Sequence, residues 1–207
     1  MLSAGIRTLK ELAMDESMPL AVVHEAIIQF ARDRSDIVIF GAHAVNAFVD
    51  EPRMTQDVDM LTTDAPTMAE ALRAHLAATF GATIRILELT PKLAYRIYQV
   101  RKPSNRHLAD IRGVAQLPTS IRVDGVLVPV PAELIAHKLI ALVARRGTPK
   151  SGSDWRDIAT LLLRFPELKV FDGDVLKRLH DHMSGEAVIQ EWLDTVSREI
   201  IPDNEEY

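Results

Sequence analysis

Residues 40–60 read FGAHAVNAFVDEPRMTQDVDM, and the architecture of the chain is best approached from this segment. The apolar run DIVIF over residues 36–40 predicts a short buried strand that ends at Gly41. The residues AHAVNAFV (42–49) predict a short helix directly after this glycine. Residues 57–61 alternate polar and apolar side chains, which is typical of a half-buried strand. The segment therefore predicts a strand, a glycine turn, a short helix and a second strand.

Outward from this segment, hydrophobic periodicity predicts an α/β first half and a helical second half. Residues 5–33 carry apolar side chains at helical spacing, and Pro19 divides them into two helices. After the segment we expect a helix over 66–80, strands over 83–89, 93–100 and 107–112, and a hairpin over 121–130 that turns at an Asp-Gly pair. Four helices follow, over 131–146, 153–165, 172–182 and 185–200.

The 207 residues divide into two predicted units, an α/β core with N-terminal helices over 1–130 and a helical lobe over 131–207 that packs on it. Apolar residues make up 47% and charged residues 26%, which excludes a disordered tail, a collagen-like chain and a coiled-coil rod. The absence of cysteine excludes disulfides and thiolate metal sites. No apolar run is long enough to span a bilayer, and the N-terminus lacks the hydrophobic region of a signal peptide. We therefore expect a cytoplasmic protein with no membrane partner.

Charge is unevenly distributed along the chain. The formal net charge of −5 argues against a protein that coats nucleic acid. Residues 92–112 are nevertheless basic, whereas residues 186–207 are acidic. The basic stretch is compatible with a local anionic ligand.

Asp57 and Asp59 are candidate metal ligands. They flank Val58 on a predicted strand, so both carboxylates point to one face, about 7 Å apart along the strand. Two carboxylates without cysteine or clustered histidine suit Mg²⁺ or Mn²⁺, and the scattered histidines predict no zinc site. Asp110 lies in another predicted strand, and three carboxylates on adjacent strands would suit two-metal phosphoryl transfer. The alternative for an Asp-x-Asp pair by itself is a solvated strand face or a turn.

The pattern Arg53-x-Thr55-x-Asp57-x-Asp59 follows the strand-to-helix turn at Gly41. A glycine at such a turn exposes the N–H groups of the helix, which favour phosphate. Together these residues resemble the nucleotidyltransferase signature, in the form that is common in the AbiEii/AbiGii toxin-like nucleotidyltransferases.

Later segments keep the order and spacing of that family's motifs. Residues 138–141 read Lys-Leu-Ile-Ala and are followed by Arg145, and residues 154–157 read Asp-Trp-Arg-Asp at the expected opening of the next helix. The resemblance covers about residues 36–165. One departure is Ala42, which stands where the family has a second glycine or a serine. Ala42 keeps the backbone N–H, but a serine hydroxyl is lost, which slightly favours a degenerate member.

The resemblance implies a nucleotidyltransferase-type mixed sheet and a catalytic set in the cleft between the sheet and the helical lobe. Asp57, Asp59 and Asp110 would hold the metal, Mg²⁺ or Mn²⁺, with Asp110 acting as ligand or base near the acceptor hydroxyl. Lys138 would bind phosphate as a compact positive charge, and Asp157 would belong to the site. The alternatives are a lysine that extends along an apolar stripe and a structural carboxylate.

The resemblance also implies a set of nucleotide-binding residues. Gly41 and Ala42 would offer backbone donors to a phosphate, and Arg53 and Thr55 would lie on the same strand face as the carboxylate pair. Asp154 would belong to the site, or else complement the dipole of its helix. For Arg53 a structural ion pair is an equal alternative.

The function that these residues imply is transfer of a nucleoside monophosphate from a nucleoside triphosphate to an acceptor hydroxyl or phosphate. Resemblance to the AbiEii-type family implies a toxin of a toxin–antitoxin or phage-defence pair, with tRNA or another RNA as acceptor and a cognate antitoxin as partner. Two alternatives stay open. One is a transferase that acts on a small molecule such as an aminoglycoside, and the other is a degenerate protein that binds a nucleotide or a partner without turnover.

Overall fold

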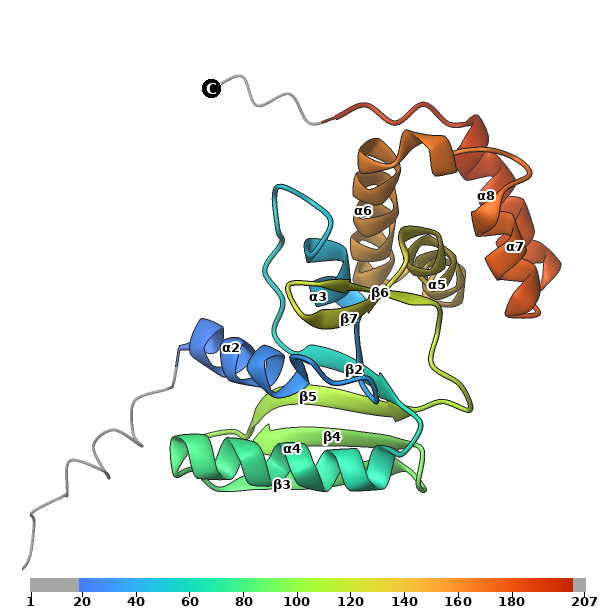
Figure 1. Cartoon of the computed structure of the whole chain (residues 1–207). Helices are drawn as coiled ribbons and strands as arrows, with labels where there is room; N and C mark the ends of the chain where they lie inside the picture. The colour runs from blue at the N-terminus through green and yellow to red at the C-terminus, as the bar shows by residue number, and fades with distance from the viewer. Residues whose placement is uncertain (1–18, 203–207) are drawn as a thin grey trace, which may run out of the picture.

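The structure, a computed structural model, describes residues 19–202, so the helix expected before Pro19 lies outside the described residues. A five-stranded sheet carries the first half of the chain (Figure 1). Its spatial order is β1 (Val38–Phe40), β2 (Val58–Thr62), β5 (Arg106–Gly113), β4 (Ala94–Gln99) and β3 (Ile84–Thr90). The strands β2 and β5 run parallel, and the other neighbouring pairs run antiparallel. The sheet is therefore mixed.

The register of the sheet places polar residues of three strands opposite one another. Asp59 on β2 pairs with Phe40 on β1 and with Asp110 on β5. Asp110 pairs in turn with Arg96 on β4. Because residues opposite one another in a sheet share a face, these four side chains form a row across one face.

The strand that carries the carboxylates begins at Val58, so Asp57 lies immediately before it. The expectation that Arg53 and Thr55 extend the same strand is wrong. The Asn46 amide group donates a hydrogen bond to the Arg53 carbonyl at 2.9 Å and accepts one from the Arg53 N–H at 3.1 Å. These two bonds satisfy the backbone that a neighbouring strand would otherwise pair, so the segment before β2 is an ordered loop.

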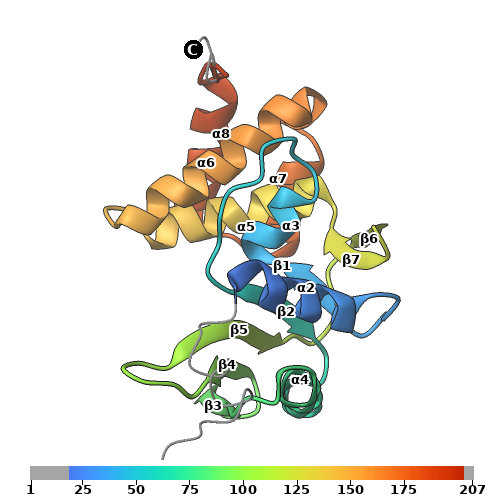
Figure 2. The same ribbon diagram turned by 90° about the vertical axis from the view of Figure 1, so that its left-hand side faces the viewer.

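Two helices cover the other face of the sheet. The helix α4 (Ala65–Phe80) packs against β2 to β5, and α2 (Leu20–Ala31) packs beside it (Figures 1 and 2). Asp64 caps α4 by accepting a hydrogen bond from the Thr67 N–H at 3.2 Å, and Gly81 ends it at a φ of 59°. Fully buried side chains from these helices and the strands form the core here, among them Ile27, Leu72, Leu76, Met60, Ile97 and Ile111.

A hairpin of β6 (Ser120–Val123) and β7 (Val126–Pro129) follows the sheet. Asp124 and Gly125 form its turn at φ values of 49° and 83°, as the Asp-Gly pair predicts. The Gly125 carbonyl accepts a hydrogen bond from the Asp33 N–H at 2.9 Å, and β7 packs against β1. The hairpin thus leads the chain from the sheet back to the β1 edge, where the helical part begins.

The C-terminal helices lie at the β1 end of the sheet, as Figure 2 shows. They are α5 (Pro131–Ala144), α6 (Pro149–Arg164), a short 3-10 helix (Pro166–Leu168), α7 (Asp174–Asp181) and α8 (Glu186–Ser197). The short helix α3 (Gly41–Asn46) contacts both α5 and α6 and therefore joins the two parts of the chain. Within residues 19–202, no helix combines the length and the apolar character that crossing a membrane requires.

The helix α6 begins at Pro149, earlier than the expected start at residue 153. Proline fits the first helical position because its missing N–H would have no partner there, and the following residues continue the helix through Gly152. Asp154 and Asp157 consequently lie beyond the first turn. Asp154 is therefore too far from the start of α6 to be stabilised mainly by the helix dipole, and side-chain contacts have to stabilise its charge.

Candidate active site

A polar cavity of about 470 Å³ lies between the face of the sheet and the helices α5 and α6. All the residues that the sequence predicts for the site line this cavity except Asp157: they are Gly41, Ala42, Arg53, Thr55, Asp57, Asp59, Asp110, Lys138 and Asp154. Arginine and lysine side chains outnumber carboxylates in the lining, six to four. The cavity therefore suits an anionic ligand.

Gly41 gives Asp59 the space that it occupies. This glycine has a φ of 66°, and a Cβ atom at its position would lie 2.2 Å from Oδ2 of Asp59. A side chain is therefore excluded by sterics as well as by backbone conformation. The strand-to-helix turn passes directly against the carboxylate, so Gly41 helps to position Asp59.

The substitution Gly41→Ala is expected to lower the free energy of unfolding by about 2–3 kcal/mol and to weaken any activity of the site. The left-handed backbone accounts for about 1–2 kcal/mol of this, and the displaced Asp59 carboxylate accounts for the rest. Gly147→Ala is the matched control, because Gly147 has a φ of 84° but no heavy atom within 4 Å of an added Cβ. Urea denaturation of both variants measures the difference, and equal losses would contradict the steric role of Gly41.

Asp110 is held by two side chains. Arg96 donates to both of its oxygens, with Nε 2.9 Å from Oδ1 and Nη2 3.1 Å from Oδ2, and His107 Nε2 lies 2.9 Å from Oδ1. Burial alone would raise the pKa of Asp110, but the hydrogen bonds from His107 and Arg96 outweigh it and hold that pKa well below the ordinary value. The same hydrogen bond to Asp110 raises the pKa of His107. Asp110 is therefore ionised at neutral pH.

His107 also joins Asp110 to Asp57. Its Nδ1 lies 3.1 Å from Oδ2 of Asp57, so the imidazole bridges the two carboxylates. The nearest ligand atoms of Asp57, His107 and Asp110 all lie within 4.8 Å of one another. A group this close is compatible with a shared cation.

Asp59 is the carboxylate that most needs a cation. Burial raises its pKa, and the negative charge of Asp57 raises it further. Among the described residues, no hydrogen bond or ion pair of the Asp59 carboxylate offsets that cost, and Arg112 and Lys138 act on it only at longer range. A hard divalent cation such as Mg²⁺ would supply the missing positive charge through oxygen ligands. The donor set of three carboxylates therefore fits the metal that the sequence predicts.

A buried ion-pair network forms the opposite wall of the cavity. Lys138 on α5 places Nζ 2.6 Å from Oδ2 of Asp157 on α6. Arg53 forms a bidentate pair with the same carboxylate, with Nε 2.7 Å from Oδ1 and Nη2 2.9 Å from Oδ2. Asp157 is 2% exposed and lies behind these two cations rather than on the cavity surface. It therefore contacts the cavity only through the side chains that it holds.

Asp154 belongs to the same network. It is 3% exposed, and its carboxylate lies 3.6 Å from the Lys138 ammonium and 3.1 Å from Arg145 Nη1. Lys150, at the start of α6, also lines the cavity. The four positive side chains on this wall, Arg53, Lys138, Arg145 and Lys150, would face the carboxylates of Asp57, Asp59 and Asp110 across any bound ligand.

His43 does not reach the cavity, although it follows the glycine turn. Its ring packs edge-on against His24 with the ring centroids 4.7 Å apart, and Nε2 of each ring is buried without a hydrogen-bond partner. Burial lowers the pKa of His43 to about 4, and the neighbouring His24 contributes to that shift. Both rings therefore act as neutral packing groups beneath the turn.

Sequence reasoning missed four basic side chains of the cavity wall: Arg96, His107, Arg112 and His137. His107 shows why. In a regular strand, residues three apart point to opposite faces, so His107 and Asp110 would not meet. A register shift beside Tyr98 places His107 opposite that residue and brings its ring to the face of Asp110. No signal in the sequence marks this irregularity.

Two comparisons with solved structures concern the fold. JHP933 from Helicobacter pylori aligns with a TM-score of 0.58 at 17% identity, covering 94% of this chain and 84% of that chain. The Megavirus polyadenylate synthase aligns with a TM-score of 0.58 at 17% identity, covering 76% of this chain. The chain matches 34% of the length of the viral enzyme. Identities this low show a shared fold, and no curated protein matches the chain.

The comparison of sequence families bears on the activity. The family described as nucleotidyl transferase AbiEii toxin, of type IV toxin–antitoxin systems, matches residues 25–205. The match confirms the family and the enzyme class that the motifs predict, and it extends beyond the segment that carries those motifs. Because this family spans nearly the whole chain, from α2 to the C-terminus, the protein belongs to the AbiEii family of nucleotidyl transferase toxins.

Proposed function

We propose that the protein transfers a nucleoside monophosphate from a nucleoside triphosphate to an RNA acceptor, with Mg²⁺ or Mn²⁺ held by Asp57, Asp59 and Asp110. The observation that carries this proposal is the placement of Asp59 directly opposite Asp110 on parallel strands, in a cavity lined by more arginine and lysine side chains than carboxylates. Such a site pairs a cation-binding face with a surface for a polyphosphate. When bound, the metal supplies positive charge that neutralises the phosphates and the attacking oxygen.

Four residues of the chain bind and orient the nucleoside triphosphate in this proposal. Lys138 and Arg53, fixed by Asp157, present positive charge to the triphosphate, and Gly41 and Ala42 offer their backbone beside it. The ion pairs fix the rotamers of the long cations before the nucleotide arrives, which lowers the entropic cost of binding.

Asp110 serves as a ligand rather than as a base in this proposal. Its two hydrogen-bond partners hold its pKa well below the ordinary value, so it takes up a proton poorly at neutral pH. Asp110 also lies on β5, whose other neighbour, β4, is farther from the helical lobe than β2 is. The acceptor would approach from that side, which leaves the α5–α6 side for the nucleotide.

An RNA acceptor is supported by the surface that continues from Asp110 across β4 and β3. Arg96 lies opposite Asp110, and Tyr98 lies opposite Arg85 on the same face. Arginine side chains beside a partly exposed tyrosine provide phosphate contacts and a ring on which a base stacks. The family implies in addition a cognate antitoxin, which we propose as the protein partner.

The test is transfer of label from each of the four nucleoside triphosphates to total bacterial RNA in the presence of Mg²⁺. The variant pair Asp57→Ala and Asp59→Ala is compared with a matched pair, Asp172→Ala and Asp174→Ala, which removes the same charge at exposed positions. We expect label on RNA with the parent and the control pair, none with the first pair, and a steep fall of transfer with added salt.

The absence of transfer to RNA with every nucleotide, in a folded protein, would contradict the proposal. Transfer to a small hydroxylated molecule that is insensitive to salt would replace RNA by the small-molecule alternative. Nucleotide binding that stabilises the fold without release of pyrophosphate would support the degenerate alternative.

A further inference from the structure

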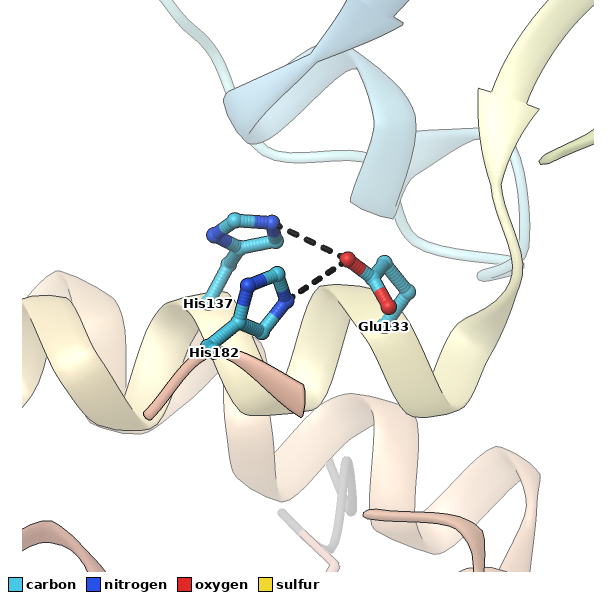
Figure 3. Close-up of side chains that lie close together, drawn as sticks. All are labelled: Glu133, His137 and His182. Carbon is cyan, nitrogen blue, oxygen red and sulfur yellow. Dashed lines mark hydrogen bonds and ion pairs between the residues drawn. The ribbon is translucent and has the colours of Figure 1, made fainter. Parts of the chain in front are cut away.

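A second group of ligand-type side chains lies outside the carboxylate site, where α5 meets α7. Glu133 and His137 are one helical turn apart on α5, and His182 follows the last residue of α7. Figure 3 shows all three side chains converging, with dashed lines from both imidazoles to one carboxylate. Their nearest ligand atoms lie within 4.8 Å of one another.

One oxygen of Glu133 is the centre of this cluster. Oε1 lies 2.8 Å from Nε2 of His182 and 3.2 Å from Nε2 of His137. In a tetrahedral zinc site with metal–ligand distances of about 2.0–2.1 Å, neighbouring ligand atoms lie about 3.3 Å apart. The two distances from Oε1 are close to this spacing, and the two imidazole nitrogens lie within 4.8 Å of each other, so side-chain shifts of about 1 Å would admit an ion.

The types of ligand select among metals. Two imidazole nitrogens and one carboxylate oxygen suit zinc and similar transition metals, whereas Mg²⁺ prefers oxygen ligands alone. This donor set therefore differs in kind from the carboxylates of the candidate active site.

Surrounding contacts hold two of the ligands in place. Glu133 is 3% exposed, and Arg178 Nε lies 3.5 Å from its second oxygen, Oε2, which leaves Oε1 to the imidazoles. The ring of Phe40 packs edge-on against His137 with the ring centroids 4.9 Å apart. Such outer contacts orient ligands in metal sites, and Arg178 forms a long ion pair with the carboxylate.

We propose that Glu133, His137 and His182 bind one zinc-like transition-metal ion, with a fourth position open to water or to a ligand of the neighbouring cavity. His137 lines that cavity, so the ion borders the active site without using its carboxylates. The ion links α5 to the end of α7, which are otherwise joined by packing and ion pairs. Sequence spacing does not predict the site, because His182 is 49 residues from Glu133.

The test is direct zinc binding by the full chain, in a His107→Gln background. This background removes the imidazole of the Asp57, His107 and Asp110 group, which otherwise competes for the ion. We expect one zinc per chain in a chelator-competition titration. At a zinc concentration of about 100 times Kd, the melting temperature should rise by about 5–10 °C.

Single substitutions locate the ion. His182→Ala and His137→Ala should each weaken zinc binding at least about 100-fold, because each removes a ligand. His180→Ala is the matched control, since His180 is exposed on α7 two residues from His182, and it should bind zinc like the parent. The absence of zinc binding by the parent would overturn the proposal, and so would equal binding by the His182→Ala and His180→Ala variants.

Discussion

Replacing Asp59 with asparagine is expected to abolish nucleotidyl transfer and, at the same time, to stabilise the fold at neutral pH. The transfer rate should fall at least about 10³-fold, because the loss of a metal ligand removes several kcal/mol of charge stabilisation. The free energy of unfolding should rise, because burial and the charge of Asp57 make an ionised Asp59 unfavourable in the folded protein. A side chain that lowers the stability of the fold is expected at functional sites, where activity requires it.

The sign of the effect on stability follows from the pKa. Asp59 has a raised pKa in the folded protein, so the native state binds its proton more tightly than the unfolded chain does. The loss of stability that an ionised Asp59 causes is therefore absent below the ordinary carboxyl pKa. It grows as the pH rises from that value through the raised pKa of the folded protein. Thermal melts without divalent cations should show the advantage of Asp59→Asn at pH 7, and the advantage should shrink toward pH 4.

An Asp172→Asn variant controls for loss of a carboxylate at an exposed position, and neither its activity nor its stability should change appreciably. An Asp59→Asn variant that still transfers nucleotides would remove Asp59 from the proposed metal site. A variant that melts earlier than the parent at pH 7 would show instead that this carboxylate is structural.

Replacing Asp157 with asparagine is expected to lower the free energy of unfolding by about 3–5 kcal/mol, since it removes the carboxylate that pairs with Arg53 and leaves Lys138 only the more distant carboxylate of Asp154. Arg53 and Lys138 both pair with this carboxylate at less than 3 Å. Burial would raise the pKa of Asp157, but the hydrogen bond from Arg53 and the charge of Lys138 outweigh it and lower that pKa. Its contribution to stability is therefore present above the ordinary carboxyl pKa and is lost as the pH falls through the lowered value.

Urea denaturation at pH 7 measures the effect of Asp157→Asn, and Asp174→Asn is its control. Asp174 lies in the exposed first turn of α7, so its replacement should change the free energy by less than about 0.5 kcal/mol. A loss at position 157 that is no larger than this would mean that the network orients Lys138 and Arg53 without stabilising the fold.

Local patterns predict the part of the site that the sheet supplies. Alternation about Val58 separates Asp57 and Asp59 from the core, and the strand pattern of residues 107–112 places Asp110 in another predicted strand. The structure pairs these two strands and sets Asp59 opposite Asp110, which the strand patterns alone do not specify. The two strand predictions depend on strand periodicity, which a sequence displays directly.

Local sequence patterns do not predict the contacts between elements that are distant in the chain. The bidentate pair of Arg53 with Asp157 exists only after α6 has docked, and nothing near either residue specifies the other. His107 reaches Asp110 through a register shift, and Pro149 extends α6 by one turn ahead of its apolar pattern. Tertiary packing decides each of these cases, and only the resemblance to a family pointed to the α5–α6 motifs in advance.

The separation of Arg53 from Asp157 has a consequence for a chain that is still being synthesised. The two residues are 104 positions apart, so at about 5–20 residues per second a ribosome adds Asp157 about 5–20 s after Arg53. In the later part of this interval, once β5 with Asp110 has been added, the nascent chain carries the acidic strands but lacks the α6 carboxylates that fix its cations. We expect the enzyme to be inert until α6 has emerged, which gives the cell a brief period in which a binding protein can reach the unfinished chain before it acts.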